Sequence, residues 1–165
     1  MQSLAEFVSR YAAQGDETAL RQQRGYRMES FSYRWIADEA NRLARELEGR
    51  NIRKGDAVLL WGENSAEWLV VFLGCLLCGA VIVPIDHAST PAFASRVAQE
   101  VNAKVVFRYR SLEQFALPVP SIVFESLFEL LTERDASVYP SPALSREDTL
   151  EIILLPELPP SPGES

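Results

Sequence analysis

The chain has 165 residues, enough for one domain with a buried core. Hydrophobic residues make up 47% and charged residues 24%, which is typical of a globular protein. With 16 Lys plus Arg against 23 Asp plus Glu, the net charge is −7. An acidic chain lacks the basic surface that binds nucleic acid or anionic lipid, so we expect no nucleic-acid partner.

The N-terminal segment, MQSLAEFVSRYAAQG, carries Glu6 and Arg10 inside an apolar pattern. This pattern predicts an amphipathic surface helix, because a secretory signal needs an unbroken apolar stretch after a basic start. The only cysteines, Cys75 and Cys78, are too few and too close for a disulfide scaffold. A reducing, cytoplasmic compartment is therefore expected.

Two extended runs, Thr18–Gln23 and Arg27–Ser32, flank Gly25 and predict a β-hairpin. Apolar residues then recur at three- and four-residue spacing, which predicts a helix with Ser32 as its N-cap and Gly49 as its C-terminal stop. These apolar residues are Trp35, Ile36, Ala40, Leu43, Ala44 and Leu47.

Short apolar, β-branched runs predict the strands Ala57–Trp61, Val81–Ile85, Lys104–Phe107 and Ser121–Phe124. Helical patterns lie between them: from Asn64 or Ser65 to about Cys78, from Pro91 to about Val101, and a short helix through Leu131. Alternating strands and helices are typical of right-handed βαβ crossovers. The predicted fold class is α/β, a parallel sheet with helices on both faces and an N-terminal β-hairpin.

The run Leu69–Ile85, LVVFLGCLLCGAVIVPI, is uncharged and approaches the roughly 20 residues that span a bilayer. However, Gly79 lies where a helix would end, Pro84 lies near the far end, and β-branched residues fill Val81–Val83. We interpret the run as a helix, a glycine stop and a buried strand, and expect no integral membrane segment.

Composition also predicts the domain organisation. An α/β subdomain is expected over residues 1–137, a linker over 138–148 and a terminal strand over 149–155. The Pro- and Ser-rich residues 156–165 are expected to be disordered.

Three segments carry a family resemblance. They are Phe31–Asp56, FSYRWIADEANRLARELEGRNIRKGD; Val58–Asp86, with Asn-Ser-x-Glu-Trp and Gly-Ala-x-x-x-Pro-x-Asp; and the run to Lys104–Phe107. The sequence resembles the adenylate-forming superfamily of acyl-CoA synthetases, luciferases and peptide-synthetase adenylation domains. Within it, the acyl-CoA synthetases of fatty acids are most similar. The resemblance covers Phe31 to Ile153 and implies a partial N-terminal subdomain of such an enzyme.

By resemblance, intact relatives use ATP and Mg²⁺ to form an acyl-adenylate, release pyrophosphate and pass the acyl group to coenzyme A. The phosphate loop, the adenine and metal sites and a mobile C-terminal domain with its lysine all come later in those chains. We therefore assign no catalytic, cofactor-binding or metal-binding residue in this sequence. The isolated chain is expected to hold no cofactor and to be inactive.

Asp148–Ile153 resembles the strand that leads into the family's phosphate loop. That loop is rich in Ser, Thr and Gly and ends in Pro-Lys-Gly, because small residues let backbone N–H groups surround phosphate oxygens. Here LLPELPPSPGES follows instead. Synonymous codons for Leu154–Ser165, read after a one-base shift, encode Phe-Thr-Ser-Gly-Thr-Thr-Ala-Glu-Pro-Arg-Gly-Val. We therefore hypothesise a frameshifted gene or clone, which DNA sequence beyond the last codon would test.

Other chemically suggestive residues have structural interpretations. Cys75 and Cys78 form a C-x-x-C pair, but zinc needs about four ligands and His87 is the only other soft candidate, so buried core is favoured. His87 follows a strand's carboxyl end, where α/β sites lie, yet without a partnered acid or nucleophile a surface or capping role is favoured. Asp86 is interpreted as a turn cap.

The remaining candidates are also read as structural. Glu63, Asn64 and Glu67 suit a loop and a helix start better than an acid–base pair. Trp35, Trp61 and Trp68 are predicted core anchors.

Two further functions stay open. The chain is a non-catalytic interaction module, which would form a homo-oligomer through an exposed sheet edge or apolar surface. Alternatively it is a stand-alone nucleotide- or CoA-binding domain, although the sequence contains no G-x-G-x-x-G or Walker pattern.

Overall fold

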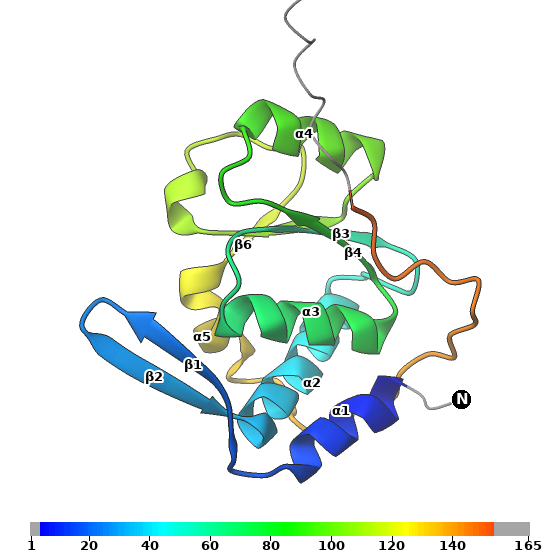
Figure 1. The fold of residues 1–165 in the computed structure, drawn as a ribbon. Coiled ribbons are helices and arrows are strands. Elements are labelled where there is room, and N and C mark those ends of the chain that lie inside the picture. Colours follow the sequence, from blue (N-terminus) through cyan, green and yellow to red (C-terminus); the bar gives the residue numbers. More distant parts are fainter. Residues whose placement is uncertain (1–3, 154–165) are drawn as a thin grey trace, which may run out of the picture.

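A four-stranded parallel sheet lies at the centre of the molecule, in the order β4-β3-β5-β6 (Figure 1). The computed structural model describes residues 4–153. In its register, Leu59 of β3 lies beside Val83 of β4 and Val106 of β5. The strands are β3 (Ala57–Trp61), β4 (Val81–Ile85), β5 (Val105–Arg108) and β6 (Ser121–Val123). The predicted parallel sheet is confirmed.

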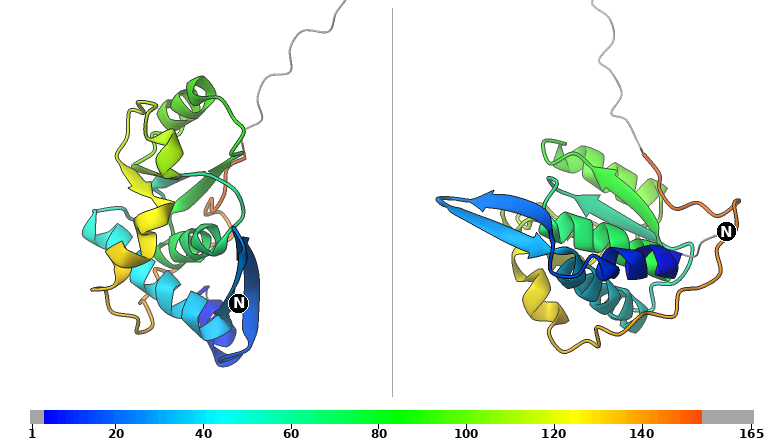
Figure 2. Two further views of the ribbon diagram at one scale, coloured as in Figure 1. Left: turned by 90° about the vertical axis from the view of Figure 1, so that its left-hand side faces the viewer. Right: turned by 60° about the horizontal axis from the view of Figure 1, so that its bottom comes forward.

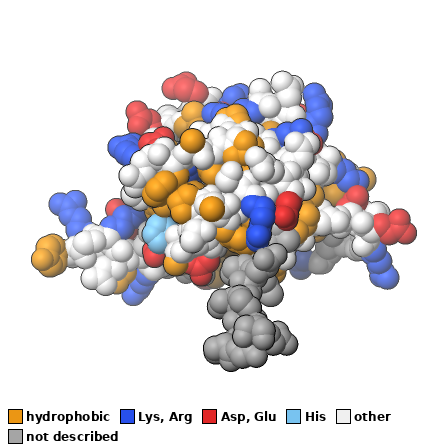
Figure 3. All heavy atoms as spheres, turned by 90° about the horizontal axis from the view of Figure 1, so that it is seen from above, with side chains coloured by type: hydrophobic (Ala, Val, Ile, Leu, Met, Phe, Trp, Pro, Cys, Tyr) orange, Lys and Arg blue, Asp and Glu red, His pale blue; other side chains and the backbone are white. Residues whose placement is uncertain are grey.

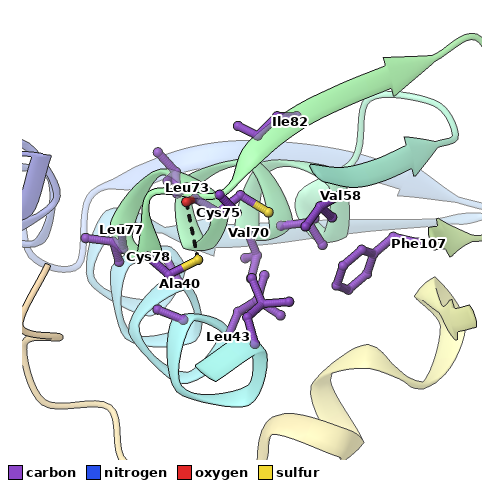
Figure 4. Packing of buried hydrophobic residues seen from close by; sticks show 14 of the residues in the cluster. Ala40, Leu43, Val58, Val70, Leu73, Cys75, Leu77, Cys78, Ile82 and Phe107 are labelled. Atoms are coloured by element: carbon purple, nitrogen blue, oxygen red, sulfur yellow. Dashed lines mark hydrogen bonds between the residues drawn. The ribbon is translucent and has the colours of Figure 1, made fainter. Parts of the chain in front are cut away.

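Helices cover both faces of this sheet, as predicted (Figures 1 and 2). One face packs against α2 (Tyr33–Gly49), α3 (Ala66–Cys78) and α5 (Leu127–Leu131), and the other against α4 (Pro91–Glu100). Alternate residues of β3 point to opposite faces: Val58 joins the larger core and Leu59 the smaller one. Figure 4 shows the larger core, where α2 and α3 meet the sheet. Two 3₁₀ turns, Arg110–Leu112 and Phe124–Ser126, follow β5 and β6.

The N-terminal elements form a separate layer beneath α2 and α3. They are α1 (Leu4–Ala13) and the antiparallel hairpin of β1 (Thr18–Arg24) and β2 (Arg27–Ser32), which projects from the body (Figure 2). The predicted hairpin is confirmed. Ser32 then caps α2 as predicted, because its Oγ accepts a hydrogen bond of 3.1 Å from the Trp35 N–H.

The end of α2 differs from the prediction. Gly49 lies inside the helix, and the left-handed residue that ends it is Asn51, with φ 60°. The Ile52 N–H then donates to Leu47 O at 3.0 Å, which satisfies a terminal carbonyl. Asn tolerates this conformation better than other side chains except glycine, so the sequence offered two candidates and the second one terminates the helix.

Two buried glutamates on α2 differ in their environments. Glu46 receives hydrogen bonds from Arg134 (2.7 Å) and Arg50 (2.9 Å). Burial alone would raise the pKa of Glu46, but these two guanidinium groups lower it overall. Burial raises the pKa of Glu39, which Arg42 only partly offsets, and Glu39 Oε2 is buried without a partner. Glu46 is thus held as a carboxylate, whereas Glu39 is not.

The segment predicted as a linker, residues 138–148, lies bound along the body. The Tyr139 N–H donates to Asn41 Oδ1 at 3.0 Å, and Lys54 Nζ lies 2.9 Å from an Asp148 oxygen. Beyond it, Glu151 forms an isolated parallel bridge with Ile82 of β4 in the predicted strand 149–155. Residues 154–155 and the predicted disordered tail, 156–165, lie outside the described residues.

Candidate functional site

The carboxyl ends of β3 and β4 border a hollow of about 480 Å³. β3 leads into α3 on one face of the sheet and β4 leads into α4 on the other, so the two loops diverge. Ligands of α/β proteins bind in such crevices at the carboxyl edge of the sheet. The hollow is lined by Gly62, Glu63, Asn64, Trp68, Pro84, Ile85, Asp86, His87 and Ala88.

The β3 side of the hollow depends on a close backbone approach at Gly62. A Cβ atom there would lie 2.7 Å from the Phe124 ring and 3.1 Å from the Tyr109 ring. The backbone of Gly62 also donates to Ile85 O at 3.3 Å, which ties the two loops together. Glycine therefore lets two aromatic rings pack directly behind the loop.

The β4 side is a tight turn built on Asp86. Its Oδ1 accepts from the Ala88 N–H at 2.7 Å, and its carbonyl accepts from the Ser89 N–H at 3.0 Å. This is the side-chain and backbone pattern of an Asx turn. Asp86 thus shapes the loop that carries His87.

His87 is half-buried, with its ring edge-on to Tyr109 at 5.4 Å between centroids. Its Nδ1 is buried without a hydrogen-bond partner. Burial raises the pKa of Tyr109; a hydrogen bond with Ser65 lowers it, and nearby glutamates raise it further. The phenol therefore stays neutral at neutral pH and supplies no base, so the pair is packed rather than arranged for proton transfer.

The charge of the hollow is negative. Glu63 and Asp86 are exposed among its lining residues, and the described lining includes no Lys or Arg. Two carboxylates without a cation repel a phosphate. The surface on the α4 side shows acidic and basic side chains interspersed with apolar patches and no broad basic field (Figure 3).

The N-terminus of α3, the other feature that could bind phosphate here, is already occupied. Gln22 of the hairpin accepts from the Ala66 N–H at 2.9 Å, and Ser65 Oγ accepts from the Trp68 N–H at 3.0 Å. The buried Glu67 carboxylate, paired with Arg24, also lies in this first turn. Helix N-termini bind anions through free N–H groups and a positive dipole, and here both are neutralised from within the protein.

The N-terminus of α4 is similarly satisfied. Thr90 Oγ1 accepts from the Phe93 N–H at 3.2 Å, and Pro91 has no N–H to offer. Sequence analysis placed Ser65 correctly as one of two possible caps of α3. It missed Gln22 and Tyr109, because nothing local in the sequence signals contacts across such separations.

The two cysteines lie in the larger core (Figure 4). Burial raises the pKa of the Cys75 thiol well above its ordinary value and that of Cys78 to about 11. The Cys78 thiol donates to Cys75 O at 3.5 Å. Both are therefore unreactive thiols. Among residues 4–153, no cluster of His, Cys, Asp or Glu is arranged to hold a metal ion.

The tryptophans pack as anchors of the fold. Trp61 is fully buried, Trp35 packs edge-on against Phe128 at 4.7 Å, and Trp68 stacks on Phe72 at 5.4 Å. Trp68 also forms a wall of the hollow. None of the helices over residues 4–153 has the length and apolarity needed to cross a membrane.

The sequence was compared with known families. The family model described as AMP-binding enzyme matches residues 7–154. The chain belongs to this family.

Relatives within the AMP-binding family are distant and much longer. The chain is 29% identical over 142 residues to crotonobetaine/carnitine–CoA ligase of Salmonella paratyphi A, covering 74% of this chain and 28% of that protein. It is 30% identical over 95 residues to surfactin synthase subunit 3 of Bacillus subtilis, covering 58% of this chain and 8% of that protein. The chain thus spans less than a third of either relative.

Solved structures show the same fold. The N-terminal domain of FACL13 from Mycobacterium tuberculosis superposes with a TM-score of 0.78 at 24% identity, covering 92% of this chain and 41% of that one. At this identity the likeness establishes the α/β fold alone. It agrees with the sheet and hairpin order described above.

Proposed function

We propose that the chain is the N-terminal part of an AMP-forming acid–thiol ligase of the fatty acyl-CoA synthetase type. The family match over residues 7–154 carries this proposal. On its own, we propose, the 165-residue chain neither binds ATP nor forms an acyl-adenylate. The intact enzyme would use ATP, Mg²⁺ and coenzyme A, whereas this part holds none of them.

The geometry of the carboxyl edge supports the inactive state. An ATP triphosphate needs free N–H donors and cations to offset its charge. Here Gln22 and Ser65 take the N–H groups of α3, and Glu63 and Asp86 make the hollow acidic. The chain supplies a sheet and its helices, to which the phosphate, adenine and metal sites would be added by other parts of an enzyme.

A cytoplasmic location is part of the same proposal. Cys75 and Cys78 are free thiols, and a reducing compartment keeps thiols in that state.

ATP–pyrophosphate exchange tests the proposal. The purified chain is incubated with labelled pyrophosphate, ATP, Mg²⁺ and fatty acids of several lengths, beside intact crotonobetaine/carnitine–CoA ligase with its own substrate. We expect label in ATP only with the intact ligase. Acid-dependent exchange by the 165-residue chain would overturn the inactive assignment, because exchange requires reversible formation of an acyl-adenylate.

A second candidate is a non-catalytic interaction module that self-associates. One observation favours it: α3 presents half-buried large apolar side chains, including Leu69 and Phe72, on one side. Exposed apolar surface of this kind marks interaction sites.

A further inference from the structure

Helix α3 is apolar on every side. Residues 68–78 carry no charge, and the helix buries Val70, Val71 and Leu77 against the sheet and α2. A helix that is apolar all round is normally buried all round. In this molecule one arc of about 100° remains half-buried, by helical geometry. We call its residues, Trp68, Leu69, Phe72 and Leu76, the α3 stripe.

The α3 stripe lies on an open side of the fold. In Figure 1, α3 lies on the near side and no helix or strand is drawn across it. The Trp68 and Phe72 rings stack with an interplanar angle of 11°, which makes a flat aromatic surface. β4, the neighbouring edge strand, pairs on its outer side with residues 150–152 only at Ile82, among the described residues.

The two ends of α3 carry opposite charges. Glu63 is exposed just before the helix begins. Arg53 and Lys54 are exposed at its other end, where Gly55 donates to Gly79 O at 2.9 Å. If two α3 helices pair in opposite directions, the acidic end of each lies beside the basic end of the other.

We propose that the α3 stripe is the interface of a homodimer in which α3 packs antiparallel to α3 of a second copy. A two-fold axis passes near Phe72, the middle residue of Ala66–Cys78, and each Glu63 faces Arg53 of the other copy. Such an interface is self-complementary, as two-fold dimers require. The dimer locates the self-association surface and does not depend on the proposed ligase function, since it uses only residues of this chain.

Sedimentation velocity over a range of concentrations tests the dimer. We expect a monomer–dimer equilibrium whose dissociation constant rises at least about 30-fold in Phe72→Glu, because the variant places unpaired charge at the interface centre. Leu130→Glu is the matched control: Leu130 is 38% exposed on α5, near the opposite sheet edge, and its variant should match the parent. A chain that stays monomeric at all concentrations, or a dimer lost only in Leu130→Glu, overturns the proposal.

Cross-linking removes the dependence on a destabilising variant. Cys75 and Cys78 are buried, so Phe72→Cys introduces one accessible thiol. Copper–phenanthroline oxidation should join two copies through this position in high yield, whereas Leu130→Cys should remain monomeric. Equal, low cross-linking of both variants would exclude a two-fold axis at Phe72.

A charge swap tests the direction of the pairing. Glu63→Arg and Arg53→Glu should each weaken the dimer about threefold to tenfold, and the double variant should recover the parent affinity. Additive weakening in the double variant would exclude the antiparallel arrangement. Circular dichroism of every variant confirms folding. Since none of these measurements involves ATP, a failed dimer and a failed ligase proposal remain distinguishable.

Discussion

The two faces of the sheet are covered by different means. On one face α2 and α3 pack closely on each other and on the strands, and the core is almost wholly apolar. On the other face only α4 and the irregular chain between β5 and β6 cover the sheet. There the buried Arg108 donates to Leu112 O at 3.0 Å and Phe115 O at 2.7 Å. Apolar packing specifies the first face, and a polar tie replaces a missing helix on the second.

The largest effect is expected where α3 meets α2. A Cβ at Gly74 would lie 2.9 Å from both Cβ and Cγ of Leu43, too close for either helix to accommodate without moving. Gly74→Ala should therefore lower the free energy of unfolding by about 2–3 kcal/mol, measured by urea denaturation.

Gly49→Ala is the matched control in α2. Its Cβ would meet only the end of the flexible Arg134 side chain, at 2.9 Å. We expect a change within about 1 kcal/mol, since alanine favours the helix. Equal losses in both variants would contradict close α2–α3 packing as the cause.

On the second face, Arg108→Met should cost about 1.5–3 kcal/mol, because it leaves two buried carbonyls without a donor. Arg110→Met, two residues on, removes an exposed guanidinium and should change stability by less than about 0.5 kcal/mol. Hydrogen exchange should speed up in residues 109–120 of Arg108→Met. Exchange that rises instead across α2 and α3 would show that the tie is not local.

The two buried glutamates of α2 should respond oppositely to pH. Glu46 has a lowered pKa, so its stabilisation is complete above its ordinary value of 4.5 and is lost as pH falls below it. Glu46→Gln should cost about 1–2 kcal/mol at pH 7, and this loss should shrink in acid. Urea titrations from pH 7 to pH 3 measure the difference from the parent.

Glu39 has a raised pKa, so its favourable contribution is present below 4.5 and is lost as pH rises through its folded value. Glu39→Gln should match or exceed the parent in stability at pH 7 and lose that advantage in acid. Parallel pH profiles for the two variants would contradict their assigned environments.

The smallest effect is expected at the tie between the hairpin and α3. Gln22→Ala removes the acceptor for the Ala66 N–H and should cost about 0.5–1 kcal/mol. Gln23→Ala, which removes only a bond to Gly25 O on the exposed hairpin, should be nearly neutral. A larger loss at Gln23 would place the stabilising contact within the hairpin.

Sequence patterns predicted most of the fold but little of the site's geometry. The strands Ala57–Trp61 and Val81–Ile85 have the predicted bounds, because buried parallel strands are continuous apolar runs with β-branched residues. Gly79 ends α3 in the left-handed conformation, with φ 75°, as a local signal predicted.

Contacts between distant residues were not predictable. Gln22 caps a helix 44 residues away, and Asn41 holds Tyr139 across 98 residues. Such bonds depend on how completed elements pack, and no local periodicity encodes them. The same holds for the edge-on contact between His87 and Tyr109, which joins the loops of two different strands.

Isothermal titration of ATP–Mg²⁺, and then of a non-hydrolysable acyl-adenylate analogue, into the purified chain tests the central claim most directly. The account predicts only heats of dilution, because the α3 N-terminus is capped from within and the hollow beside it is acidic. Saturable binding with a stoichiometry near one would contradict it, since a nucleotide site would then exist within these residues.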